Sequence, residues 1–172
     1  MMTVERDDSR LRGTLFMPCV LDRLTDLNPE TRVERFSRGV SISALRRSVL
    51  ENVSLILNSR SHPGAEAWGG DAEVSASVLG LGLPDFCGST GGLVRRERLR
   101  EEIVRQLRTF EPRFLPDSIH VNFTGEHVTD GGVLEMEVRA VISVAPLKEE
   151  LVFRARLNME TGESAVVTSE DR

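Results

Sequence analysis

The chain has 172 residues, which is the usual length of a single domain and enough to bury a sizeable core. Its net charge of −5 argues against a general binder of nucleic acid, and its low aromatic content of 5% leaves few surfaces for stacking bases or sugars. The N-terminus lacks the apolar core of a signal peptide, and no apolar run approaches the ~18 residues of a membrane span. We therefore expect a cytoplasmic protein that reaches a membrane only through partners.

The chain is expected to begin with a flexible tail over residues 1–13, because this stretch is polar, and to continue as one domain over residues 14–172. The domain opens with an amphipathic segment that Pro29 ends. Four apolar residues at helical spacing predict a short helix there, namely Phe16, Val20, Leu24 and Leu27. This helix could pack on its own domain or dock elsewhere.

Two longer helices are predicted further along. The first lies in SISALRRSVLENVSLILN, where Ser41 or Ser43 can cap the start. Its apolar stripe consists of Ile42, Leu45, Val49, Val53 and Ile56. The second runs from about Leu93 to Phe110 and has a highly charged surface, on which Glu101 and Arg105 are expected to pair. Its apolar stripe consists of Leu99, Ile103, Leu107 and Phe110.

The segment between these helices, SASVLGLGLPDF, contains two glycines among apolar residues. This pattern predicts a backbone that approaches another part of the molecule closely. Leu83-Pro84-Asp85 is typical of a turn. We regard Gly82, Leu83, Pro84 and Asp85 as secondary candidates for a functional or structural site.

The apolar period changes from 3.6 to 2 after residue 118, which predicts strands. The expected inward residues of the first three strands are Ile119, Val121 and Phe123, then Leu134, Met136, Val138, Ala140, Ile142 and Val144, then Leu151, Phe153, Ala155 and Leu157. Glu135 and Glu137 are expected to pair across strands with Arg154 and Arg156. The sequence therefore predicts an α+β fold, in which N-terminal helices pack on one face of a mainly antiparallel β-meander.

No coherent catalytic, metal or cofactor motif is present, since the chain lacks HExxH, GxSxG and a phosphate-binding loop. Glu111 is the best candidate for a catalytic acid. A glycosidase acid needs a raised pKa, however, and the neighbouring Arg113 and Arg108 favour the ionised carboxylate. We therefore expect no catalytic residue, no metal and no cofactor.

Glu111-Pro112-Arg113 has a clearer mechanical meaning. Pro112 pushes Glu111 out of helical geometry and ends the preceding helix, so that two opposite charges are held at the junction with the first strand. Such a fork could bind a complementary group on another chain. It could equally be an internal clamp that orients the helix on the sheet, and the residues alone leave both roles open.

Four stretches in one order carry a family resemblance: SVLENVSLILNSR, SVLGLGLPDF, LREEIVRQLRTFEPRF and the meander that closes with LVFRARLNMETGES. Together they resemble the TssE family of type VI secretion baseplate proteins, which is similar to the wedge proteins of contractile phage tails. The resemblance covers about residues 14–168. Its signature is the triplet after a helix, which Glu111, Pro112 and Arg113 all match.

The resemblance implies a non-enzymatic structural subunit at the inner face of the cytoplasmic membrane. The implied partners are the wedge proteins TssF, TssG and TssK and the sheath subunits TssB and TssC. One edge of the sheet would accept a strand from the sheath, and the triplet would be a partner contact or a core clamp. Two alternatives remain: a lysozyme-like peptidoglycan hydrolase using Glu111, and a wedge protein of a phage tail or extracellular contractile injection system.

Overall fold

The computed structural model describes residues 15–25, 29–30, 32, 39–61, 71–85, 93–124 and 132–168. The chain divides into two units, each compact by itself, which comprise residues 1–49 and 50–172. The tail expected at residues 1–13 lies outside the described residues.

The first unit differs from the expected amphipathic helix. Among the described residues between 15 and 30, only α1 (Val20–Leu24) is helical. Phe16 instead forms an antiparallel bridge with Val40, with N–H···O distances of 2.9 and 2.8 Å, and its side chain is buried. Val20 and Leu24 are 69% and 78% exposed, so these two residues do not pack on the described part of the chain, and docking elsewhere stays a prediction. Leu27 lies outside the described residues.

Helix α2 (Ile42–Asn58) follows the predicted pattern. Ser41 caps its start, because its Oγ accepts the N–H of Ala44 at 3.3 Å. Four of the five predicted stripe residues are fully buried, namely Leu45, Val49, Val53 and Ile56. The regular 3.6-residue spacing of large aliphatic side chains therefore predicted both the helix and its buried face.

Helix α5 (Leu93–Phe110) has the predicted bounds. Its stripe is buried at Leu99, Ile103 and Leu107, whereas Phe110 is only half-buried. The predicted pair between Glu101 and Arg105 is wrong, because Arg105 binds Glu102 instead, with its Nε 2.9 Å from Oε2. An i,i+3 pair competes well with an i,i+4 pair on a helix surface.

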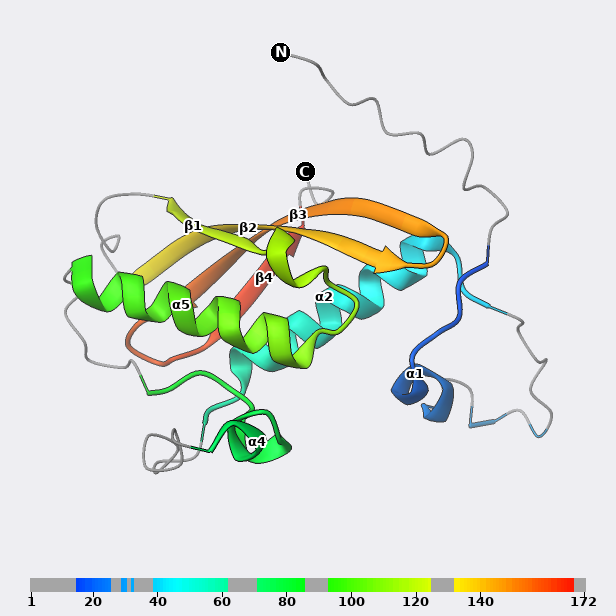
Figure 1. Ribbon diagram of the computed structural model, residues 1–172, viewed down its shortest axis with the longest axis horizontal. Coiled ribbons are helices and arrows are strands. Elements are labelled where there is room, and N and C mark those ends of the chain that lie inside the picture. Colours follow the sequence, from blue (N-terminus) through cyan, green and yellow to red (C-terminus); the bar gives the residue numbers. More distant parts are fainter. Residues whose placement is uncertain are drawn as a thin grey trace, which may run out of the picture. The chain divides into compact units, whose positions relative to one another are not determined.

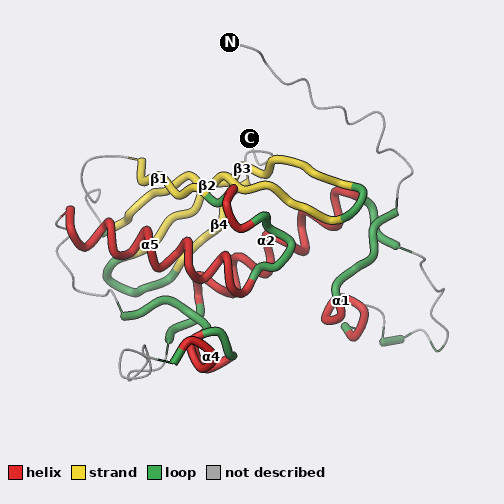
Figure 2. The backbone as a smooth tube through the Cα atoms, viewed as in Figure 1, coloured by secondary structure: helices red, strands yellow, loops and turns green. Residues whose placement is uncertain are grey.

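The sheet has four antiparallel strands in the order β1-β2-β3-β4. They are β1 (His120–Thr124), β2 (Val133–Val144), β3 (Leu147–Asn158) and β4 (Ser164–Thr168). Helix α5 and the C-terminal part of α2 lie on one face of this sheet (Figure 1). Figure 2 shows the long β2–β3 hairpin flanked by the shorter β1 and β4. The predicted α+β meander is thus confirmed.

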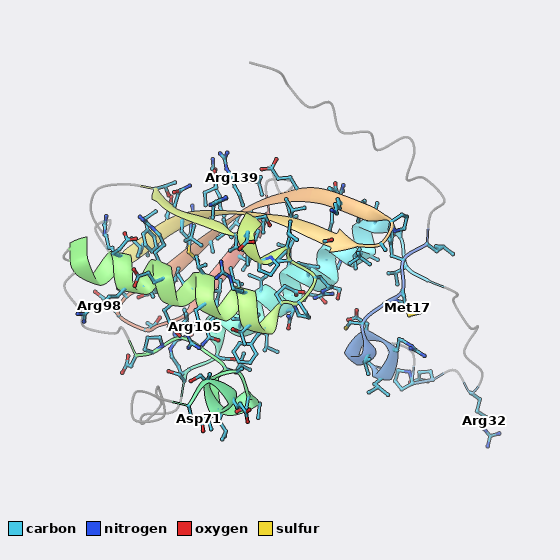
Figure 3. The ribbon with its side chains drawn as sticks, in the orientation of Figure 1. Met17, Arg32, Asp71, Arg98, Arg105 and Arg139 are labelled. Atoms are coloured by element: carbon cyan, nitrogen blue, oxygen red, sulfur yellow. The ribbon has the colours of Figure 1, made fainter. Side chains whose placement is uncertain are left out.

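The alternation of buried and exposed residues places the core between the sheet and these helices. Most of the predicted inward residues are buried, including Met136, Val138, Phe153 and Leu157. On the opposite face, Arg139 projects away from the helices (Figure 3).

The predicted cross-strand pairs of this outer face are partly correct. Glu135 lies opposite Arg156, and Glu137 lies opposite Arg154. Arg156 binds Glu135 at 2.8 Å, but Glu137 is bound by Arg139 of its own strand at 2.8 Å. The register of the hairpin therefore follows the sequence pattern, whereas the choice of ion pair does not.

Candidate functional site

The Glu-Pro-Arg triplet forms a tight turn directly after α5. The N–H of Glu111 still donates to the carbonyl of Leu107 at 3.0 Å, which continues the helical pattern by one residue. The carbonyl of Glu111 accepts the N–H of Phe114 at 3.0 Å, which closes a turn around the exposed Pro112. Pro112 ends the helix here because its ring disfavours the helical conformation at the preceding residue.

The carboxylate of Glu111 is fully buried, with an exposed fraction of 0%. Arg113 binds both of its oxygens: Nε lies 2.7 Å from Oε1, and Nη2 lies 2.6 Å from Oε2. The backbone N–H of Arg113 also donates to Oε1 at 3.1 Å. Burial of a carboxylate is costly unless it is paired and hydrogen-bonded, and this fork satisfies both conditions. The Arg113 side chain is 15% exposed, so it covers the carboxylate from the solvent side.

Asn52 of α2 completes the junction. Its Nδ2 donates to Glu111 Oε2 at 2.9 Å and to the carbonyl of Phe110 at 3.1 Å. The last carbonyls of a helix lack partners within the helix, and Asn52 supplies one for the end of α5. A single amide therefore connects α2 to both the backbone and the carboxylate at the end of α5.

The residues that follow the triplet attach it to the sheet. The carbonyl of Arg113 accepts the N–H of Ser143 at 2.8 Å, and the N–H of Leu115 donates to the carbonyl of Val141 at 2.8 Å. Between them, the buried Phe114 lies opposite Ile142 in an antiparallel bridge. The triplet is thus the point at which α2, α5 and β2 meet.

This arrangement is suited to holding elements together rather than to acid catalysis. A general acid must reach its substrate, but the Glu111 carboxylate has no exposed surface and both of its oxygens accept hydrogen bonds. A partner chain would meet Pro112 and the exposed part of Arg113, not the carboxylate. We call this intramolecular arrangement of Glu111 and Arg113 the clamp; a contact between the triplet and a partner stays a prediction.

The secondary candidates lie against another part of α5. The N–H of Gly82 donates to Gln106 Oε1 at 2.9 Å, and Gln106 Nε2 donates to the carbonyl of Gly80 at 2.8 Å. Leu83 is buried and bonds through its N–H to the carbonyl of Ser59 at 3.0 Å. The predicted close approach of the glycines is therefore correct.

Leu83 forms a parallel bridge with Arg60, and the turn expected at Leu83-Pro84-Asp85 stays a prediction, because the residues from 86 on lie outside the described part of the chain. Pro84 and Asp85 follow Leu83 as exposed, irregular residues. Upstream, the short helix α4 (Ala72–Ser75) and the turn η1 (Val78–Gly80) were not predicted. Asp71 caps α4 by accepting the N–H groups of Glu73 and Val74.

Glu102 and Arg105 add an ion pair beside Gln106. Burial alone would raise the pKa of Glu102, but hydrogen bonds from Arg105 and Gln106 and the charge of Arg105 hold that pKa below its usual value. The hydrogen bond to Glu102 raises the pKa of Arg105 in return. Glu102 therefore fixes the orientation of the Gln106 amide, whose Nε2 lies 3.1 Å from Glu102 Oε1.

Two amides at these sites, Asn52 and Gln106, were not identified from the sequence. A signal was present, because each is a polar residue bordering an apolar helical stripe. Asn52 lies three residues after Val49, and Gln106 lies three residues after Ile103. Such amides must find partners when buried, and here they bind the segments that cross the helix.

Among the described residues, no cluster of His, Cys, Asp and Glu side chains could hold a metal ion. None of the helices described is both long enough and apolar enough to cross a membrane.

Comparison with known proteins identifies the family. A search of curated proteins and a search of solved structures each found no match. The model of one protein family, described as baseplate wedge protein gp25, matches residues 43–147. This range is more than half of the chain, and it contains α2 from its second residue on, α5, the Glu111–Arg113 clamp and β2. The chain therefore belongs to the family of the baseplate wedge protein gp25, whose type VI secretion homologue is TssE.

Proposed function

We propose that this chain is a non-enzymatic structural subunit of a type VI secretion baseplate, which joins the wedge proteins TssF, TssG and TssK and starts assembly of the TssB–TssC sheath. The family match over residues 43–147 carries the proposal, because that family is a structural component of baseplates. The proposed location is cytoplasmic, at the inner face of the membrane, with all membrane contact made by partners.

The clamp at Glu111 and Arg113 supports a mechanical role. A subunit that transmits its position between neighbours needs helices that do not shift on the sheet. Asn52, Glu111 and Arg113 hold the end of α5 with hydrogen bonds of 2.6 to 3.1 Å in a buried setting. This rigidity makes the helical layer a stable platform for the wedge partners.

The sheet has one edge that suits strand addition. On the β1 side, β2 continues past β1, and this part is covered by residues 113–118 through bonds to Val141 and Ser143. On the opposite side, β4 pairs only with Phe153–Leu157 of the longer β3. Residues 147–152 therefore border β2 alone among the described strands. We call residues 147–152 the β3 edge.

Hydrogen bonds near the end of β3 show which backbone groups point to this edge. The N–H of Asn158 donates to Glu163 on the β4 side, whereas the N–H of Met159 donates to Gly132 on the β2 side. Because the direction alternates along a strand, Glu150 and Val152 direct their backbone groups to the β4 side, as Asn158 does. An exposed edge of this kind is a template for a strand from another chain. The sheath subunit is the proposed donor.

The charges at this edge also fit a specific acceptor. Lys148 and Glu150 are exposed, and Glu149 lies between them. Charged residues on an edge strand discourage indiscriminate strand pairing. A donor strand would need complementary charges, which makes the pairing selective.

The peptidoglycan hydrolase alternative receives no support from the buried, fully bonded Glu111 carboxylate. The wedge protein of a phage tail or extracellular injection system remains the second candidate, because the matched family is described only as a baseplate wedge protein. The partners distinguish these two functions.

Co-expression tests the proposal. The native chain is expected to co-elute with the TssF–TssG complex during size-exclusion chromatography, with or without TssK. Co-elution only with wedge proteins of a phage tail would favour the second candidate. Elution apart from every baseplate protein would contradict both.

A further inference from the structure

The tip formed by α4 and η1 displays two apolar side chains to solvent. Val78 is 78% exposed and Leu79 is 54% exposed, although both are large aliphatic residues. We call Val78 and Leu79 the apolar tip. Scattered exposed apolar residues are common, so exposure alone carries no meaning.

Close packing and hydrogen bonds fix the backbone of the apolar tip on its buried side. A Cβ at Gly80 would lie 2.1 Å from the carbonyl oxygen of Ser75, so the turn fits against α4 only because this residue is glycine. The Gln106 side chain then bonds to both Gly80 and Gly82 from the buried side. Ser77 Oγ donates to the carbonyl of Val74 at 2.7 Å and so joins η1 to α4 once more.

A backbone fixed in this way loses little conformational entropy when it binds. A surface that is already rigid in its bound conformation binds more tightly, because less conformational entropy is lost on association. The geometry therefore indicates a surface that is complete before its partner arrives.

The charges around the apolar tip define the chemistry of the partner. Residues 71–85 carry three acidic side chains and no basic one. Asp71, Glu73 and Asp85 are all exposed, and Figure 3 shows Asp71 at α4, away from the sheet. Anionic lipid and nucleic acid would be repelled by this surface. A basic protein surface would be attracted to it.

We propose that the apolar tip inserts into an apolar socket of a folded baseplate protein, and that Arg or Lys side chains around this socket pair with Asp71 and Glu73. This inference rests on the proposed function, since the partner is a baseplate protein. The interface is separate from the β3 edge, so that one subunit can hold a wedge partner and a sheath strand at the same time.

The test measures affinity for the TssF–TssG complex and for TssK, each presented separately to the full chain. The double variant Val78→Ser/Leu79→Ser is expected to weaken binding to one of them at least about tenfold, because two aliphatic side chains no longer leave water on binding. Leu115→Ser is the matched control, because Leu115 is also exposed but lies outside the tip. Circular dichroism should show both variants folded, because these side chains contribute little to the core.

Charge reversal tests the basic rim. Glu73→Lys is expected to weaken binding to the same partner and to reduce the salt dependence of that binding, whereas Glu163→Lys, which lies on the β3–β4 turn and outside residues 71–85, should do neither. The oligomeric state of the double variant is also compared with that of the native chain, each without partners. A difference would show that the occupant is a second copy of this chain and would overturn the inference. Binding of the native chain to anionic phosphatidylserine vesicles through the tip would overturn it in favour of a membrane.

The outcomes separate this inference from the proposed function. If the native chain binds a baseplate protein and the double variant binds it equally well, the apolar tip is not the contact, and only this inference is overturned. If the native chain binds no baseplate protein, the proposed function is overturned, and this inference with it.

Discussion

The side-chain amide of Asn58, at the end of α2, pairs with the backbone of Ser164 in both directions. Its Oδ1 accepts the N–H of Ser164 at 2.9 Å, and its Nδ2 donates to the Ser164 carbonyl at 3.0 Å. Asn58 thus occupies the outer side of β4 at its first residue, where another strand would otherwise bond. The backbone groups of Val166, two residues on, point to the same outer side.

This pairing predicts that Asn58 holds the start of β4. Asn58→Ala should lower the free energy of unfolding by about 1–2 kcal/mol, because two backbone groups lose their partner. Hydrogen exchange should speed up in β4 more than in β2. Asn122→Ala, which truncates an exposed side chain on β1, is the control and should change neither. Equal exchange in the native chain and Asn58→Ala would contradict the role of this amide.

The buried clamp predicts an asymmetry between its two halves. Arg113→Ala leaves the fully buried carboxylate of Glu111 without its main partner. This variant should therefore lower the free energy of unfolding by about 3–5 kcal/mol. Glu111→Ala should cost less, because the Arg113 side chain already reaches solvent. Denaturation in urea measures both changes.

The control for the clamp is Arg108→Ala. Arg108 is 52% exposed and lies 3.8 Å from Asp117, so its loss should change stability by less than about 0.5 kcal/mol. If Glu111→Ala and Arg113→Ala kept native stability but failed to bind wedge proteins, the triplet would be a partner contact rather than a clamp.

The glycines behind the apolar tip predict a graded response to alanine. Gly80→Ala and Gly82→Ala should each cost at least about 2 kcal/mol, because the new Cβ meets fixed backbone at 2.1 and 2.6 Å, and Gly82 also has a φ of +108°. Gly132→Ala should cost only about 1 kcal/mol. Its nearest neighbour is the flexible Glu160 side chain at 3.0 Å, so that strain at a φ of +72° dominates. Thermal unfolding, followed by circular dichroism, measures the three changes. An equal loss of stability at all three positions would contradict the prediction.

The Glu102–Arg105 pair predicts a pH dependence of stability. The pKa of Glu102 in the folded chain lies below its ordinary value. The pair therefore stabilises the fold at every pH above the ordinary pKa, and this stabilisation is lost as the pH falls through the lowered pKa. Between about pH 6 and about pH 3, the native chain should therefore lose more stability than Glu102→Gln.

The matched control for this pH dependence is Glu101→Gln, since Glu101 is exposed on the same helix. The stability of Glu101→Gln should depend on pH in the same way as that of the native chain. If Glu101→Gln flattened the acid limb and Glu102→Gln did not, the i,i+4 pair expected from the sequence would be the true one.

The sequence predicted the regular elements well because their periods are unambiguous. Helix α5 repeats large aliphatic residues every three or four positions, and β3 alternates them with charges. The helix predicted to include Phe16 is wrong for a different reason. The apolar residues there do have helical spacing, but Phe16 pairs with Val40, 24 residues further along the chain, and so lies outside the helix. Spacing records local preference and not long-range pairing.

The candidate site was only partly predictable. The triplet marked the end of α5, but its neighbouring charges could not distinguish an internal clamp from a partner contact. That distinction depends on the burial of Glu111 and on Asn52, which lies 59 positions away in the sequence. The β3 edge could not be predicted from the sequence either, because it follows from the unequal lengths of β3 and β4 in the folded sheet.

The most direct test of the central claim is sheath assembly started by the reconstituted baseplate. Glu150→Pro removes one N–H that points to the β3 edge and leaves the bonds between β2 and β3 in place, whereas Glu150→Ala keeps that N–H. Wedges containing the native chain or Glu150→Ala should start TssB–TssC sheaths, and wedges containing Glu150→Pro should assemble but start far fewer. Equal sheath formation with all three chains would contradict the claim that this edge receives the first sheath strand.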